Sequence, residues 1–327
     1  MIGNFQIRTD LALEARENYD SDDARIRGVK VEEEEDDGRE IYTTTVTIET
    51  ENAAKAMGKP TGTYITIEAP NMSASDEGYH REISVELARH ICHLMGERKG
   101  AVLVVGLGNR DVTPDALGPA VIGNLKITRH MIKEYGRNGK ELEKSGEISA
   151  IVPGVMAQTG METLEIIRGI VAETKPEIVI TVDALAARST RRLNRTIQIT
   201  DTGINPGSGV GNHRNAINQE TLGVPVLAVG VPTVVDAATI VNDTMEELIA
   251  QMDSSAAMQK LGGTLGTLNQ AEKHEMIREL ISPHLNTMFV TPKDIDETVK
   301  YLSYTISEGL NLAFSDWQEK TEENENV

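Results

Sequence analysis

The chain has 327 residues and a formal net charge of −19 at pH 7, from 51 acidic and 32 basic residues. Such a surface repels phosphate backbones and anionic lipid headgroups, so we expect no direct nucleic-acid partner and no membrane partner. The single cysteine, Cys92, excludes an intramolecular disulfide. No stretch has the length and hydrophobicity of a membrane span, and the N-terminus lacks the apolar core of a signal peptide. These features predict a cytoplasmic globular protein.

The acidic residues are concentrated towards the two ends of the chain. Residues 32–37 read EEEEDD, and residues 315–327 carry five acids and one lysine. Runs of like charge repel themselves, so we expect solvated loops or tails at both places. We therefore look for the chemistry in the middle of the chain.

Strands and helices are expected in the following order. β-Branched residues predict strands at 41–48 and 63–68, with a short helix or turn at 52–59 between them and an amphipathic helix at 82–97. After that, apolar runs and helical periodicity alternate. They predict strands at 101–108, 148–153, 177–183, 196–200 and 224–232, and helices at 114–135, 160–174 and from 232 to about 251.

This alternation predicts an α/β fold with a mostly parallel sheet flanked by helices. Residues 11–80 are expected to add a small β-rich layer to a core at 81–251. A flexible, glycine-containing segment and C-terminal helices should fill 252–327. The last of these helices is expected at 292–313, with Thr291 as its N-cap and proline at its first position. Another is expected near 271–282.

Open α/β sheets bind ligands beyond the carboxyl ends of their strands, and two aspartates occupy such positions. The first is Asp115. The strand at 101–108 ends in GLG at 106–108, and TPD at 113–115 is then expected to open a helix. Asp115 is either a helix-start residue, stabilised by the helix dipole, or a site residue. The glycines are weak evidence for a dinucleotide site, because Asp111 stands where GxGxxG requires its third glycine.

The second is Asp183, which is expected to end the apolar strand at 177–183. A carboxylate there is costly unless it is paired or lies in a cleft, although aspartate is also a common turn residue. If Asp183 and Asp115 converge, they cannot both ionise easily. One would then act as a base towards water and the other as an acid, with pKa values that belong to the pair.

Two other patterns are weaker. The histidines and the cysteine in HICH at 90–93 lie in an amphipathic helix, and no second pair with zinc spacing accompanies them, so we expect no metal site. The glycine-rich segment at 203–214 permits close approach of its backbone to a substrate, and GSG within it does not supply a serine nucleophile elbow. We expect no cofactor.

Five motifs, taken together and in order, resemble the germination protease family of endospore-forming bacteria. They are VVGLGNRDVTPDALGP (104–119), PGVMAQTGMET (153–163), TVDALAARS (181–189), DTGINPGSGVGN (201–212) and GVPTVVDAATI (230–240). Members of this family are endopeptidases that degrade small acid-soluble spore proteins. The resemblance implies the phosphorylase/hydrolase-like fold shared with hydrogenase-maturation proteases, a homotetramer, and a location in the spore core.

The resemblance also implies that Asp115 and Asp183 are the functional aspartates of an atypical aspartic-type protease. In hydrogenase-maturation proteases the equivalent positions bind a metal together with a histidine; the two aspartates match here, whereas His213 of the glycine-rich segment is no clear match for that histidine. Metal-assisted hydrolysis by the same aspartates therefore stays an alternative. A nucleotide- or nucleoside-binding α/β protein is the alternative from another class.

Members of the family are made as zymogens that remove an N-terminal propeptide. The segment TDLALE at 9–14 repeats the substrate pattern of an acid, a large apolar residue, alanine, any residue and an acid. We therefore predict self-cleavage between Asp10 and Leu11, with residues 1–10 as the propeptide and 11–327 as the protease domain.

An acid before the cleaved bond implies a cationic subsite, for which arginine is suited because it binds carboxylates through two hydrogen bonds. A solvated basic face is the alternative. The candidate arginines are Arg188, Arg191, Arg192, Arg195 and Arg214, and Gly207 and Gly209 are candidates for contact with the substrate backbone.

Overall fold

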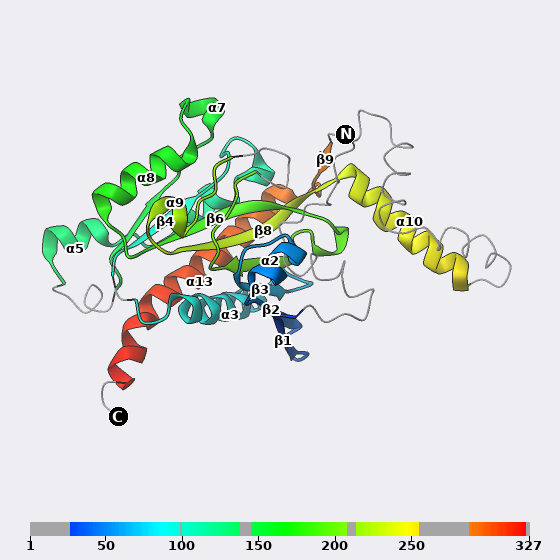
Figure 1. Ribbon diagram of the computed structural model, residues 1–327, viewed down its shortest axis with the longest axis horizontal. Coiled ribbons are helices and arrows are strands. Elements are labelled where there is room, and N and C mark those ends of the chain that lie inside the picture. The colour runs from blue at the N-terminus through cyan, green and yellow to red at the C-terminus, as the bar shows by residue number, and fades with distance from the viewer. Residues whose placement is uncertain (1–26, 99, 138–144, 208–213, 255–287, 325–327) are drawn as a thin grey trace.

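The computed structural model describes residues 27–98, 100–137, 145–207, 214–254 and 288–324. These residues form a nine-stranded sheet in the order β1-β2-β3-β7-β8-β6-β4-β5, with β9 paired to β8. Figure 1 shows how the strands and helices are arranged. The strands are β1 (Val29–Asp36), β2 (Ile41–Ile48), β3 (Gly62–Glu68), β4 (Val102–Gly106), β5 (Ile148–Ile151), β6 (Ile178–Ala187), β7 (Thr196–Thr200), β8 (Val226–Asp236) and β9 (Phe289–Val290).

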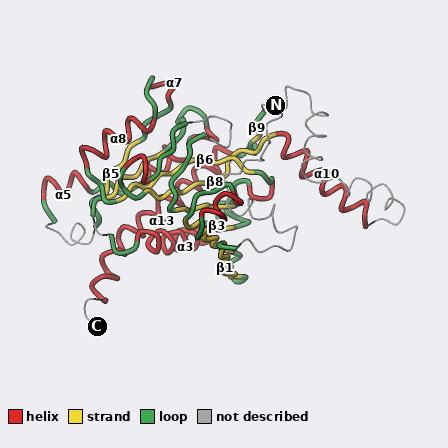
Figure 2. The backbone as a smooth tube through the Cα atoms, viewed as in Figure 1, coloured by secondary structure: helices red, strands yellow, loops and turns green. Residues whose placement is uncertain are grey.

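Helices pack against both faces of the sheet (Figure 2). Apolar side chains of α3, α4 and α13 bury one face, and those of α8 and α9 bury the other. None of the helices in the described residues is long and apolar enough to cross a membrane. The helices are α2 (Glu51–Met57), α3 (Glu77–Met95), α4 (Leu117–Asn124), α5 (Arg129–Tyr135), α7 (Met156–Thr159), α8 (Thr163–Thr174), α9 (Gln219–Leu222), α10 (Ala237–Ser254) and α13 (Ile295–Asn324), with 3₁₀ turns η2 (Thr113–Asp115) and η3 (Thr190–Arg192).

The α/β class is confirmed, but the sheet is mixed rather than mostly parallel. β4 is parallel to β5 and β6, and β6 is parallel to β8. The pairs from β1 to β3, together with β3–β7, β7–β8 and β8–β9, are antiparallel. The strands before residue 80 therefore extend the same sheet through β3 and β7 and are not a separate layer. Local sequence patterns predict β2 and β3 but do not specify so distant a pairing partner.

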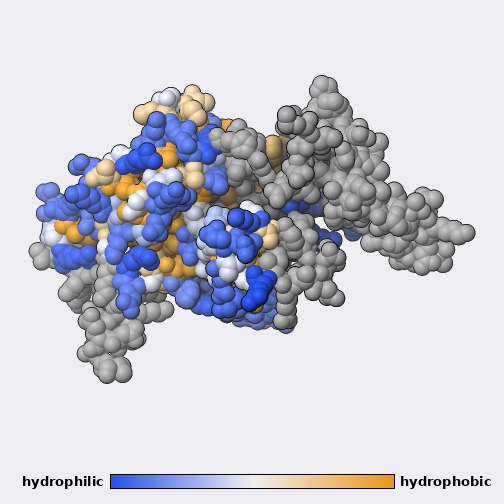
Figure 3. Space-filling view, in the orientation of Figure 1, coloured by the Kyte–Doolittle hydropathy of each residue, from blue (hydrophilic) through white to orange (hydrophobic). Residues whose placement is uncertain are grey.

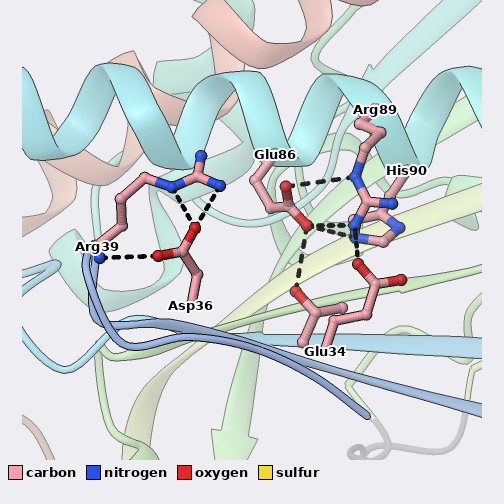
Figure 4. Close-up of polar contacts among 7 residues, drawn as sticks. Glu34, Asp36, Arg39, Glu86, Arg89 and His90 are labelled. Carbon is pink, nitrogen blue, oxygen red and sulfur yellow. Dashed lines mark hydrogen bonds and ion pairs between the residues drawn. The ribbon is translucent and has the colours of Figure 1, made fainter. Parts of the chain in front are cut away.

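The acidic run at 32–37 lies mostly in the edge strand β1, so the expectation of a solvated loop there is wrong. Cations of the same region pair with its carboxylates: Arg89 of α3 lies 2.7 Å from Glu34, and Arg39 lies 2.6 Å from Asp36 (Figure 4). Charged side chains on an edge strand discourage pairing with other chains. The acidic run is therefore compatible with a strand because that strand lies at the edge of the sheet.

Most predicted elements are found within a few residues of their expected bounds, with three differences. The helix expected at 114–135 is divided into η2, α4 and α5, because the backbone at Leu125 is extended. β6 continues past Asp183 to Ala187. The last helix begins at Ile295 and continues past the expected end at 313 to Asn324, so most of the acidic segment at 315–327 is helical and the expectation of a solvated loop or tail there is wrong. The hydroxyl of Thr291 does not cap this helix but donates to the carbonyl of Thr233. The helix expected at 271–282 lies outside the described residues.

Candidate active site

Asp183 lies in β6, just beyond the carboxyl end of the neighbouring parallel strand β4. β4 ends at Gly106, which is paired with Val182, so Asp183 is the first residue of β6 beyond the β4 partner. On its other side it is paired with Gly230 of β8. The residue is 6% exposed, and its Oδ1 accepts a hydrogen bond from the backbone N–H of Ala184 at 2.9 Å. Asp183 therefore occupies the predicted edge, although it does not end its strand.

Asp115 reaches the same edge from the loop that follows β4. The backbone N–H of Leu107 donates to the carbonyl of Val182 at 2.8 Å, which holds the start of this loop beside β6. The loop ends in η2, where Oδ2 of Asp115 accepts a hydrogen bond from the N–H of Asn109 at 2.8 Å. α4 begins only at Leu117, so the carboxylate binds the preceding loop instead of occupying the first turn of an α-helix.

Three glycines allow η2 and the start of α4 to lie directly on the strand ends. A Cβ atom at Gly108, whose φ is +111°, would overlap the carbonyl of Asp115. A Cβ atom at Gly106 would overlap the carbonyl of Gly118, and one at Gly118 would overlap that of Val182. The GLG sequence thus serves close packing of backbone segments. This packing places the turn that carries Asp115 next to Val182, the residue before Asp183.

The surroundings of Asp115 act on its charge in opposite directions. Burial raises the pKa of its carboxyl, while the hydrogen bond from Asn109 and the positive charge of Arg214 lower it; the net pKa is raised. A carboxyl group of this kind keeps its proton more readily than an exposed aspartate does. The predicted residue Arg214 is therefore an electrostatic neighbour of Asp115.

The other predicted arginines differ in their surroundings. Arg192 is 8% exposed, and its Nε lies 3.3 Å from Glu68, so it connects the turn after β6 to β3. Arg191 and Arg195 are exposed. Arg188 directly follows β6 and is half-buried, with Nε and Nη2 of its guanidinium inside the protein. The alternative of a solvated basic face therefore fits the exposed Arg191 and Arg195, but it does not fit the half-buried Arg188.

The glycine-rich segment is described only at its ends. Gly207 has a φ of +73°, a conformation that favours glycine. Gly209 and His213 lie outside the described residues, as do Asp10 and Leu11 of the predicted cleavage site. These four assignments stay predictions.

In the described part of the chain, no three His, Cys, Asp or Glu side chains are grouped as metal ligands. His90 is buried and lies 2.9 Å from Glu86 of its own helix, whereas His93 is exposed. The HICH pattern thus belongs to the structure of α3. The aspartates of the candidate site have no third ligand among the described residues, so we derive no step through a metal.

Two residues of the site were missed by the sequence analysis. The amide of Gln158 in α7 donates to Oδ1 of Asn109 at 3.1 Å and to Oδ2 of Asp111 at 3.0 Å. Two apolar side chains near Gln158 in the sequence are well exposed, Met156 at 43% and Met161 at 50%, and Figure 3 shows a moderately hydrophobic surface at the tip that α7 forms.

The second is Thr233, whose hydroxyl donates to the carbonyl of Pro114 at 2.6 Å. Gln158 and Thr233 both lie inside motifs that carry the family resemblance, which is the signal that points to them. Their residue types alone suggest no chemistry, because amide and hydroxyl groups are common throughout protein surfaces and strands.

Comparisons with known proteins agree on one family. The family model described as germination protease matches residues 7–257 and 248–326. The germination protease of Caldanaerobacter subterraneus subsp. tengcongensis is 49% identical over 317 residues, covering 96% of this chain and 95% of the relative. Those of Clostridium tetani and Bacillus cytotoxicus are 46% and 38% identical, and each alignment covers at least 94% of both chains.

Proposed function

We infer the activity of this chain from the family to which it belongs, the germination proteases. Membership confirms the resemblance of the five sequence motifs and gives a peptidase of spore germination. We propose further that its substrates are small acid-soluble spore proteins, that it acts in the spore core as a homotetramer, and that it is an atypical aspartic-type endopeptidase.

The proposed chemistry is activation of water by Asp115 and Asp183. The observation that supports it is the packing of η2 against β6 and β8, together with the close approach of Gly108, just beyond β4, to Asp115, at the edge where Asp183 lies. Two neighbouring carboxyl groups share a proton more easily than they both ionise. The ionised member takes a proton from water as it attacks the peptide carbonyl, and the protonated member donates to the departing amine. The raised pKa of Asp115, which comes mainly from burial, is compatible with a proton held on this residue.

We propose that the substrate is oriented beside this pair by cations and by backbone groups of the glycine-rich segment. Arg188 and Arg214 would bind the acidic side chain before the cleaved bond, and backbone groups at Gly207 and Gly209 would approach the peptide. The half-buried position of Arg188 and the charge of Arg214 near Asp115 support this arrangement.

Self-processing would use the same chemistry on the chain's own N-terminus. We propose that the protein is made as a zymogen and cuts itself between Asp10 and Leu11, which releases residues 1–10. The support is the acid–apolar–alanine pattern at this point, which repeats the pattern of the proposed substrates.

The decisive experiment replaces Asp183 by asparagine in the full chain and follows self-cleavage by mass spectrometry. We expect no product beginning at Leu11 from Asp183→Asn, and normal processing by Asp37→Asn, a matched change at an exposed turn residue. Retained cleavage in Asp183→Asn overturns the two-aspartate proposal. Loss of wild-type cleavage on chelation, with recovery after a divalent ion is added, would favour the metal-assisted alternative.

A further inference from the structure

Thr233 occupies an irregular position in β8. Along the pairing of β8 with β6, Pro232 lies opposite Leu185, and the next pair is Val234 with Ala186. Thr233 is therefore the extra residue of a β-bulge. Bulges of this kind are frequent next to active sites, where they change the direction of a side chain.

The bulge directs the Thr233 hydroxyl at the turn that carries Asp115. Thr233 is 1% exposed, and its Oγ1 donates to the carbonyl of Pro114 at 2.6 Å. The carbonyl of Thr233 itself accepts a hydrogen bond from the hydroxyl of Thr291 at 2.8 Å. A buried group with this geometry has little freedom to move, so it is a firm anchor for the turn.

The Pro114 carbonyl belongs to the same peptide plane as the backbone N–H of Asp115. That N–H donates to the carbonyl of Val112 at 2.8 Å. The plane is therefore held on both sides, by Thr233 at the oxygen and by Val112 at the nitrogen. Because a peptide unit is planar, holding both of its sides fixes the N–Cα bond of Asp115, from which the side chain branches.

We propose that Thr233 is a positioning residue for peptide hydrolysis, which acts by fixing the Pro114–Asp115 peptide so that the Asp115 carboxyl is aimed at the reacting atoms beside Asp183. This inference rests on the proposed function of the two aspartates. A displacement of about 1 Å in a catalytic group can reduce a rate roughly a hundredfold, so a single hydrogen bond behind Asp115 has a measurable effect on turnover.

The test compares Thr233→Val, which keeps the shape but removes the hydroxyl, with Thr233→Ser, which keeps the hydroxyl. Cleavage of a peptide with residues 5–16 of the chain is measured in full-length preparations whose N-termini have been matched by mass spectrometry. We expect kcat to fall roughly tenfold or more in Thr233→Val with KM changed less than about twofold, and to recover in Thr233→Ser.

The matched structural control is Thr128→Val. Thr128 also donates its hydroxyl to a backbone carbonyl, that of Gly146 at 2.5 Å, but it precedes α5 and contacts Ile148 at the start of β5, away from the carboxyl edge. Thr128→Val should lower the melting temperature without lowering kcat. If Thr233→Val does not fold, Thr233→Ala takes its place.

A pH profile separates positioning from simple stability. A loosened turn admits water to Asp115 and reduces the burial that raises its pKa. Whichever limb of the kcat profile Asp115 controls should then move to lower pH in Thr233→Val and stay in place in Thr233→Ser.

The outcomes are distinct. An unchanged kcat in Thr233→Val, or an equal loss of kcat in Thr233→Ser, overturns the positioning role of Thr233. If Asp115→Asn is inactive in the same assay, the two-aspartate proposal still stands. An active Asp115→Asn overturns the proposed function itself.

Discussion

The backbone N–H of Asn109 donates a hydrogen bond to Oδ2 of Asp115 over 2.8 Å, which ties the loop after β4 to the turn that carries the carboxylate. This bond favours the ionised form of Asp115, as does the charge of Arg214, whereas burial favours the neutral form and has the larger effect. Asp115 therefore exchanges its proton at a higher pH than an exposed aspartate. Its neighbours offer a direct way to change that pH.

Replacing Arg214 by glutamine should move the pH dependence of cleavage to higher pH. Without the arginine charge the pKa of Asp115 rises further, and each limb of the kcat/KM profile that Asp115 controls follows it. The profile is measured on the peptide of residues 5–16, with Arg191→Gln, a change of an exposed arginine, as the control. A profile that stays in place or moves to lower pH contradicts the electrostatic role of Arg214.

Asp115→Asn should be inactive and yet more stable than the wild type at neutral pH. Because the folded-state pKa of Asp115 is raised, the ionised carboxylate destabilises the folded chain above the unfolded-state pKa of 3.8. Asparagine removes that charge and can still accept the hydrogen bond of Asn109. We expect a higher melting temperature at pH 7, with the difference disappearing as the pH falls below about 4, where the wild-type residue is itself protonated.

Thermal unfolding at several pH values measures this difference, and Asp37→Asn serves as the exposed control. A lower melting temperature for Asp115→Asn throughout the range would show that the carboxylate stabilises the fold. The burial argument for the raised pKa would then be wrong.

The place of the two aspartates in the fold was predictable from the sequence, but the contacts that hold them there were not. An apolar strand ending in GLG and another containing Asp183 indicate the carboxyl edge, because buried parallel strands have a strong sequence pattern. The contacts that bring Asp115 there depend on Gly118 meeting Val182 and on Thr233 meeting Pro114. These residues are far apart in the chain, and no local periodicity reports such contacts.

The acidic run at 32–37 failed as a loop prediction for a related reason. Its charge indicates solvent exposure, and the side chains are indeed mostly exposed. Exposure does not distinguish a loop from an edge strand, however, and it is the pairing with β2 that makes this segment a strand. Arg89 of α3, more than fifty residues away, then supplies a partner for Glu34 that the local sequence does not show.

Glu86 of α3, beside Arg89, should make the stability of the protein pH-dependent. Its carboxylate accepts hydrogen bonds from His90 and Arg89, the larger effect being that of His90, and these lower its pKa to about 2 (Figure 4). A depressed pKa stabilises the folded state above the unfolded-state value of 4.5, and this contribution is lost as the pH falls towards about 2.

Glu86→Gln should therefore lower the free energy of unfolding at pH 7 by about 1–2 kcal/mol, after allowance for solvent screening. The difference from the wild type should shrink between pH 4.5 and about 2. Urea unfolding followed by circular dichroism measures it, with Glu97→Gln as the control at an exposed position beyond α3. A difference that is constant down to the lowest pH would contradict the ionic origin of the effect.

Arg188 should determine selectivity for an acid before the cleaved bond. The test uses two peptides of residues 5–16, one with Asp10 and one with asparagine in its place. Because a guanidinium binds a carboxylate through two parallel hydrogen bonds, Arg188→Ala should reduce the preference for the acidic peptide in kcat/KM roughly tenfold. Arg188→Lys, which keeps the charge but not the planar fork, should retain part of the preference.

The control is Arg191→Ala, which removes an exposed arginine three residues further along the same turn and should leave the ratio unchanged. Melting temperatures of all variants show whether the loss of the half-buried Arg188 side chain has disturbed the turn after β6. A normal preference in a well-folded Arg188→Ala excludes this arginine from the subsite and leaves Arg214 as the candidate. Equal losses in Arg188→Ala and Arg191→Ala would instead indicate that the preference comes from the overall positive charge of the turn, since a specific two-bond contact distinguishes neighbouring arginines and a diffuse field does not.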